Sequence, residues 1–115
     1  MSFPSPHSVF DSIDHIAVNV SDIVRAVKWY QSSFRCELVF QDKSQAVLQF
    51  ANVRLQLVLP SMDPPHLAFV RDDAGKLGEL RERADSRFTT FIADSTGNMV
   101  EIIAPYGAED APTDN

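Results

Sequence analysis

An internal repeat constrains the fold of this chain more than any other feature of its sequence. The first copy opens with His15-Ile16-Ala17-Val18 and closes with Leu55-Gln56-Leu57-Val58-Leu59-Pro60. The second copy opens with His66-Leu67-Ala68-Phe69 and closes with Val100-Glu101-Ile102-Ile103-Ala104-Pro105. In each copy the first and the last apolar segment is interrupted by one polar residue. Such a repeat predicts two copies of one supersecondary unit.

Length and composition limit the class of protein. A chain of 115 residues with 44% hydrophobic residues is expected to form one globular domain. Its net charge of −6 disfavours nucleic acid as a partner, because an acidic surface repels phosphates. No basic cluster or apolar run of about 20 residues indicates a membrane. The start lacks a secretory signal, and the single cysteine, Cys36, fits a reducing compartment, so a cytoplasmic protein is expected.

The first copy has the pattern of a β-α-β-β-β unit. Residues 13–20 alternate in polarity and are rich in β-branched side chains, which predicts a strand. Ser21 and Asp22 can cap a helix whose apolar residues follow with helical spacing to Phe34. Three further strands are predicted over residues 36–40, 46–50 and 54–59.

The second copy is shorter than the first. Strands are predicted over 66–70, 87–93 and 99–104, with a turn at 94–98 in which Gly97 supplies a positive φ. A helix is expected from Asp72 or Asp73 to about Ala84. From the opening His to the closing polar residue, the first copy spans 41 positions (56 − 15) and the second 35 (101 − 66). Six missing residues are about one strand, so one strand of this copy is expected to be lost or reduced.

The expected fold class is α+β, with two modules of which the second is shortened. Module 1 spans residues 13–60 and module 2 spans residues 65–105. Residues 1–12 are expected to form an N-terminal arm, since they are rich in Ser and Pro. Residues 106–115 are expected to form a flexible acidic tail.

Strand alternation places the four polar residues on one kind of face. Ile16, Val18 and Val20 share the face that a helix must cover, which leaves His15 on the opposite face. The same reasoning leaves His66, Gln56 and Glu101 facing away from the helices. If the two copies curl around one cleft, all four side chains converge there.

Two neutral imidazoles and a carboxylate are suitable ligands for Zn, Fe, Ni or Mn. Gln56 can add a weak carbonyl-oxygen ligand, and four protein ligands on an octahedral ion leave positions open for substrate. Taken singly, each residue has a plainer explanation: a His on a strand is more often a hydrogen-bonded structural residue, and a Glu on a polar face is usually solvated. Their equivalent places in a repeat favour the metal site.

The chain resembles the vicinal-oxygen-chelate superfamily, which includes glyoxalase I, bleomycin-resistance proteins, fosfomycin-resistance proteins and extradiol dioxygenases. The resemblance covers residues 13–105. It rests on the order and spacing of four segments: Ile13–Asp22, Trp29-Tyr30 before Cys36–Phe40, Pro65–Phe69 and Gly97–Ile102. It implies paired βαβββ modules that form a curved mixed sheet around a metal-containing cleft. It also implies a homodimer, which the exposed sheet edges of a short module favour as well.

Carried across residue by residue, the resemblance makes His15, Gln56, His66 and Glu101 the metal ligands. Glu101 stands where glyoxalase-like members keep the carboxylate that also serves as a base. The implied function is a metal-dependent enzyme of the lyase or isomerase kind, acting on a small oxygen-rich molecule. The alternatives are a metal-free binding protein of the bleomycin-resistance kind and a small dioxygenase. The shortened second module departs from the family, because a lost strand would open one side of the cleft.

Arg54 precedes Gln56 by two positions and therefore shares its face. We hypothesise that Arg54 binds an anionic group on the substrate. The alternative is an arginine that is solvated or paired with a Glu.

Overall fold

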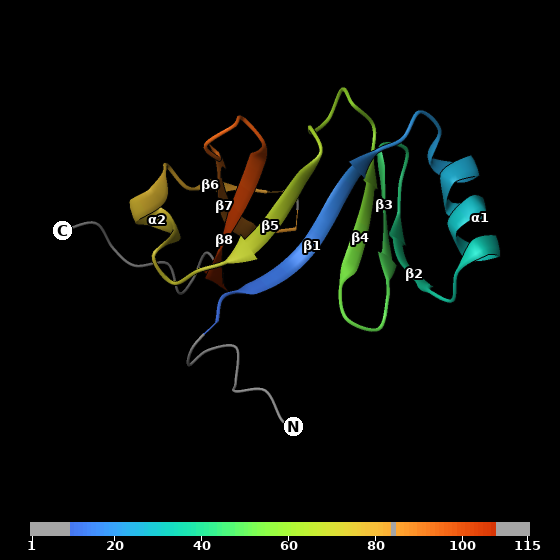
Figure 1. Ribbon diagram of the computed structural model, residues 1–115, viewed down its shortest axis with the longest axis horizontal. Coiled ribbons are helices and arrows are strands. Elements are labelled where there is room, and N and C mark those ends of the chain that lie inside the picture. The colour runs from blue at the N-terminus through green and yellow to red at the C-terminus, as the bar shows by residue number, and fades with distance from the viewer. Residues whose placement is uncertain (1–9, 84, 108–115) are drawn as a thin grey trace. The chain divides into compact units, whose positions relative to one another are not determined.

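The computed structural model describes residues 10–83 and 85–107, and these form eight strands and two helices (Figure 1). The strands belong to one mixed sheet with the order β2-β3-β4-β1-β5-β8-β7-β6. The predicted α+β class is therefore confirmed. The described residues divide into two compact units, one of Asp14–Leu67 and one of residues 10–13 with 68–83 and 85–107. Within the described ranges, no helix is long and apolar enough to span a membrane.

The unit Asp14–Leu67 contains the first module. Its elements follow the predicted order: β1 (Ser12–Asn19), α1 (Ile23–Ser33), β2 (Glu37–Gln41), β3 (Gln45–Gln49) and β4 (Arg54–Val58). The two ends of the module lie next to each other, because β1 pairs in parallel with β4. The strands β2, β3 and β4 form an antiparallel meander beside them. A parallel pair of this kind needs a long crossover, which α1 and the two intervening strands supply.

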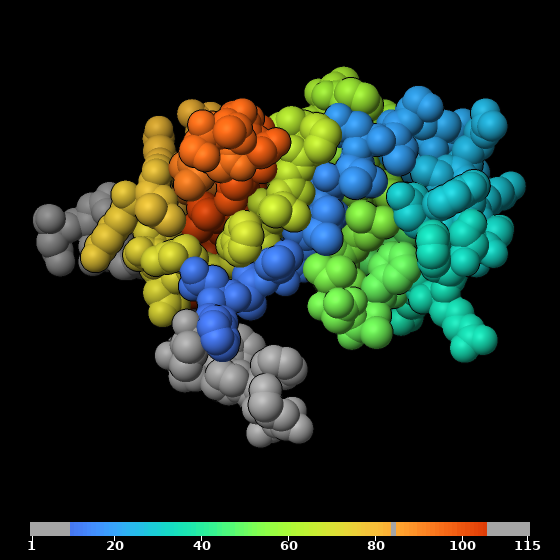
Figure 2. Space-filling model, viewed as in Figure 1, coloured from blue at the N-terminus to red at the C-terminus, as the bar shows by residue number. Residues whose placement is uncertain are grey.

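The core of this unit lies between α1 and the strands β3 and β4 (Figure 1). Figure 2 shows the same view with the atoms as spheres, in which the residues of α1 lie on the right. Ile23 and Val27 of α1 are buried against Ala46, Leu48 and Leu57. Strand alternation is the reason, since it gives β3 and β4 one apolar face. Of the helix-side residues predicted for the first module, Ile16 is not a member of this core cluster. The others join it: Val18, Val20, Leu55, Leu57 and Leu59.

Hydrogen bonds between nearby residues set both ends of α1. Asp22 is the N-cap, and its carboxylate accepts a hydrogen bond from the backbone N–H of Arg25 at 3.0 Å, as predicted. At the other end no glycine is available. Phe34 ends the helix in an extended conformation, and its N–H still donates to the carbonyl of Tyr30 at 2.8 Å.

The second module is built from shorter pieces. It comprises β5 (His66–Val70), α2 (Ala74–Leu77), β6 (Arg81–Glu82), β7 (Arg87–Ala93) and β8 (Met99–Gly107). Ala74, Ile102 and Ala104 form its buried core. The expected loss falls on β6, which is reduced to two residues and lies at the end of the sheet. β8 runs three residues beyond the predicted end, so residues 106 and 107 belong to a strand and not to the tail. Residues 1–9 of the arm and 108–115 of the tail lie outside the described residues.

The helix predicted from Asp72 or Asp73 to Ala84 is wrong in its extent. It has only four residues, and the chain turns at Gly78 into the short strand β6. Gly78 has an extended backbone, and a Cβ there would clash with the hydroxyl oxygen of Thr90 on β7. The extended backbone of Gly78, packed closely against Thr90 of β7, is incompatible with a helix that continues through this residue. The carboxylate of Asp73 is also engaged by Arg71 instead of capping the helix.

Replacing Gly78 by alanine tests this close approach. Gly78→Ala is expected to lower the free energy of unfolding by about 1–3 kcal/mol, because the methyl group must displace Thr90. Gly75→Ala is the matched control. Its Cβ would lie 3.5 Å from Cδ1 of Leu80, an ordinary contact, so it is expected to stabilise α2 by about 0.5–1 kcal/mol. Urea denaturation measures both; equal values for the two variants would contradict the close approach.

A hydrogen-bonded turn leads into β8. The carboxylate of Asp94 accepts bonds from the side chain of Asn98 and from the backbone N–H groups of Thr96 and Asn98, each at 2.9 Å. Gly97 has the predicted positive φ of 94°. The bond from the Asn98 side chain, followed by the two backbone bonds, lowers the pKa of Asp94 to about 2. The turn therefore favours the ionised carboxylate.

Asp94→Ala is expected to destabilise the protein in a pH-dependent way. The pKa of Asp94 is lower in the folded chain than the roughly 3.9 of an unfolded chain, so its contribution is complete above about pH 4. The contribution falls as the pH drops toward the folded value. The difference in denaturation midpoint between wild type and variant should thus keep its full size from pH 7 down to about pH 4 and should narrow between pH 4 and pH 2. A difference that stays constant over this range would refute the assignment.

Candidate functional site

Two of the predicted ligands, His15 and His66, lie against each other in the unit Asp14–Leu67. Their Nε2 atoms are 3.3 Å apart, and their rings meet edge to face with centroids 5.4 Å apart. Both residues are buried, with 9% and 6% of their surface exposed. The opening residues of the two copies are thus brought together, as the repeat predicted.

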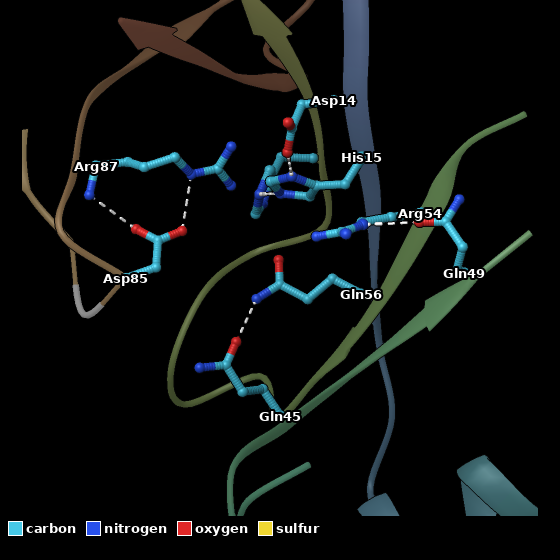
Figure 3. A network of polar contacts seen from close by, with 9 residues as sticks. Asp14, His15, Gln45, Gln49, Arg54, Gln56, Asp85 and Arg87 are labelled. Atoms are coloured by element: carbon cyan, nitrogen blue, oxygen red, sulfur yellow. Dashed lines mark hydrogen bonds and ion pairs between the residues drawn. The ribbon is translucent and has the colours of Figure 1, made fainter. Parts of the chain in front are cut away.

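The other nitrogen of each ring has an acceptor. Nδ1 of His15 lies 2.8 Å from a carboxylate oxygen of Asp14 (Figure 3), and Nδ1 of His66 lies 2.8 Å from the carbonyl oxygen of Pro64. A carboxylate and a backbone carbonyl can only accept, so each neutral ring carries its proton on Nδ1. In a neutral ring with its proton on Nδ1, Nε2 is the nitrogen that is able to bind a metal. This is the form in which histidine binds a metal.

A clamp on the linker between the modules positions the acceptor of His66. The side-chain amide of Asn19, at the end of β1, donates to the carbonyl of Asp63 at 2.9 Å and to that of Val58 at 3.2 Å. These bonds hold the linker next to the end of β1. Pro64 follows Asp63 directly, and its restricted φ helps to direct its carbonyl to the ring of His66.

Glu101 lies on β8, in the other unit of the chain. It is 4% exposed, and its neighbour Ile102 belongs to the core of that unit. Alternation along β8 therefore turns Glu101 away from the core, as predicted. Among the described residues, one group of three His, Cys, Asp or Glu side chains could hold a metal ion. It consists of His15, His66 and Glu101.

Gln56, the fourth predicted ligand, shares the face of the histidines. It is the register partner of Ala17 on β1, and register partners of a parallel pair point the same way. Its amide nitrogen donates to Oε1 of Gln45 at 2.6 Å (Figure 3). This bond fixes the amide so that its oxygen, the only atom of the group able to bind a metal, is on the opposite side from Gln45.

Arg54 stands next to His15 in the sheet. The two residues are register partners in β1 and β4, so their side chains lie on the same face. The Nε of Arg54 donates to Oε1 of Gln49 at 2.8 Å (Figure 3), and the residue is exposed. Its partner is therefore a glutamine and not the Glu considered as the alternative. The bond at Nε leaves the terminal nitrogens of the guanidinium as the donors that a ligand can reach.

Sequence reasoning missed the residues that support the site. Asp14, Asn19 and Pro64 hold the histidines or their acceptors, and Gln45 and Gln49 hold Gln56 and Arg54. Alternation of β3 could have identified the two glutamines, because Gln45 and Gln49 occupy the face opposite to Ala46 and Leu48. No sequence signal indicated the roles of Asn19 and Pro64.

Comparison with known proteins relates the chain to others by fold. No family model and no curated sequence matches it. A solved hypothetical protein from Bacillus halodurans C-125 is similar at 15% identity, with a TM-score of 0.67 over 91% of this chain and 99% of that one. A structure from Legionella pneumophila named as an NAD-dependent benzaldehyde dehydrogenase is similar at 13% identity, with a TM-score of 0.59 over 77% and 96%. A glyoxalase/bleomycin resistance protein/dioxygenase from Alicyclobacillus acidocaldarius is 20% identical over 93% and 98%, with a TM-score of 0.40.

These likenesses concern the fold alone, since every identity is low. The resemblance of the sequence implied two βαβββ modules whose strands form one mixed sheet. The order and pairing of the elements agree with this arrangement, with the third element of the second module reduced to the two-residue strand β6. The chain therefore shares its overall fold with the two solved structures that have TM-scores of 0.67 and 0.59.

Proposed function

We propose that this protein is a metal-dependent enzyme of the glyoxalase kind. His15, His66 and Glu101 would hold one divalent ion of zinc, nickel, manganese or iron, with the amide oxygen of Gln56 as a fourth ligand. The substrate is a small oxygen-rich molecule, and the chemistry is of the lyase or isomerase type. The proposal rests above all on the two facing Nε2 atoms of the buried histidines.

The histidine pair offers the ligand atoms that a divalent transition metal prefers. The two Nε2 nitrogens lie 3.3 Å apart in a buried place, and imidazole nitrogen is a common ligand of zinc, nickel and iron. Glu101, the third member of the group, adds a buried carboxylate oxygen to the two nitrogens.

The residues around the pair supply the remaining functions. A bound metal would polarise a carbonyl or hydroxyl oxygen of the substrate, which makes a neighbouring C–H bond more acidic. Glu101 is suited to take and return that proton, because a carboxylate next to the polarised group needs no movement of the backbone. Arg54 would bind an anionic group through its terminal nitrogens, one strand away from His15.

Removal of either histidine is expected to abolish tight metal binding. The wild-type chain should bind about one Zn²⁺ or Co²⁺ per chain, and His15→Ala and His66→Ala should each weaken binding by about 100-fold or more, since a lost ligand costs more than a lost supporting residue. Elemental analysis and isothermal titration calorimetry measure this. His7→Ala is the control, because it removes a histidine that is not one of the proposed ligands. It should bind the metal as tightly as the wild-type chain does.

Three outcomes separate the proposed enzyme from the alternatives. Metal content that is unchanged in both histidine variants would refute the site. A wild-type chain that binds small ligands but no metal would favour the metal-free binding protein. Oxygen consumption with catechols by the Fe²⁺-loaded chain would favour the dioxygenase. The expected homodimer stays a prediction.

Arg54→Ala is expected to weaken the binding of small carboxylates by roughly tenfold, as expected for the loss of an exposed charge-assisted hydrogen bond. The binding of their uncharged methyl esters should not change. Arg25→Ala, which removes an exposed arginine from α1, is the control for net charge. Calorimetric titration of 2-hydroxy and 2-oxo acids against their esters tests the role. Equal losses for acids and esters, or for both arginine variants, would contradict it.

A further inference from the structure

The two halves of the repeat hold their histidines in different ways. In the first copy the residue before the histidine is Asp14, whose carboxylate accepts from the ring at 2.8 Å. In the second copy the equivalent residue is Pro65, which offers no side-chain acceptor. The ring of His66 bonds instead to the backbone carbonyl of Pro64. At Nδ1, the ring of His15 thus meets a charged acceptor and the ring of His66 a neutral one.

The bond between Asp14 and His15 is not a consequence of strand geometry. Successive side chains of a strand point to opposite faces, so alternation alone would separate these neighbours. The carboxylate of Asp14 nevertheless reaches the ring of His15, and the Asp14 side chain is only 24% exposed. Partial burial of a carboxylate is unfavourable without partners, and the ring N–H is one of them.

We propose that Asp14 is a positioning residue that makes His15 the stronger of the two histidine ligands. This inference rests on the proposed metal site. Asp14 acts in two ways: it holds the proton on Nδ1, which presents Nε2 for coordination, and its negative charge increases the electron density of the ring. The carbonyl of Pro64 provides the first effect for His66 but lacks the second. The two copies therefore supply ligands of unequal strength from equivalent positions.

The first experiment needs no metal. In the metal-free wild-type chain, the ¹⁵N chemical shifts of the His15 ring should report a protonated Nδ1 and an unprotonated Nε2. Asp14→Asn keeps a carbonyl acceptor and should preserve this tautomer, whereas Asp14→Ala should lose it. The His66 ring should keep its tautomer in both variants and so serves as an internal control. An unchanged His15 tautomer in Asp14→Ala would overturn the inference.

The second experiment measures metal affinity by titration with Zn²⁺ and Co²⁺. Asp14→Asn should weaken binding by about 10–100-fold, although it preserves the tautomer, because it removes the charge. Asp72→Asn is the matched control: it removes the same charge from an exposed position and should bind like wild type. Equal affinities for wild type and Asp14→Asn, or equal losses in both variants, would overturn the role of Asp14 and leave the proposed metal site intact. A wild-type chain that binds no metal would overturn both.

Discussion

The contact between His15 and His66 is the constraint on which the rest of the site depends. Each ring is turned by an acceptor at Nδ1, and the two remaining nitrogens are directed at each other in a buried place. The fold holds both rings in this arrangement. The parallel pairing of β1 with β4 holds one ring, and the linker clamped by Asn19 holds the acceptor of the other. The orientation of both rings is thus fixed by the protein itself. Hydrogen bonds of this kind, from outside the ligand set, commonly orient the histidines of metal sites.

Shortening of the second module leaves the strand that carries Glu101 unaffected. The missing residues are taken from the helix α2 and from β6, which lies at the end of the sheet order. β8 keeps an extensive antiparallel pairing with β7, in which Glu101 is opposite Phe91. The turn at Asp94 joins these two strands, and the close approach of Gly78 to Thr90 packs the shortened segment onto β7. The shortening therefore affects the end of the sheet, at β6. The strand β8, which carries Glu101 and lies next to β5, is kept.

Much of the fold could be read from the sequence, because the periodicity of a strand and the capping of a helix are local. The limits of α1 and the positions of β3, β5 and β7 agree with the predictions, and the cap at Asp22 has the expected bond. The segment after Asp73 could not be read in this way. Its apolar spacing suits a helix, but the packing of Gly78 against β7 is non-local and overrides that preference. The extension of β8 likewise depends on its pairing with β7.

The sequence by itself determined which residues can take part in the site. Repetition and strand parity are enough to give His15, Gln56, His66 and Glu101 equivalent places, since both depend only on spacing along the chain. The tertiary structure decided how the two histidines are presented. Asp14 reaches a ring that alternation would turn away from it, and the carbonyl of Pro64 reaches His66 because Asn19 holds the linker. The tautomer of an imidazole is set by the acceptor that lies next to one of its nitrogens in the folded chain. The periodicity of the sequence does not show which acceptor that is.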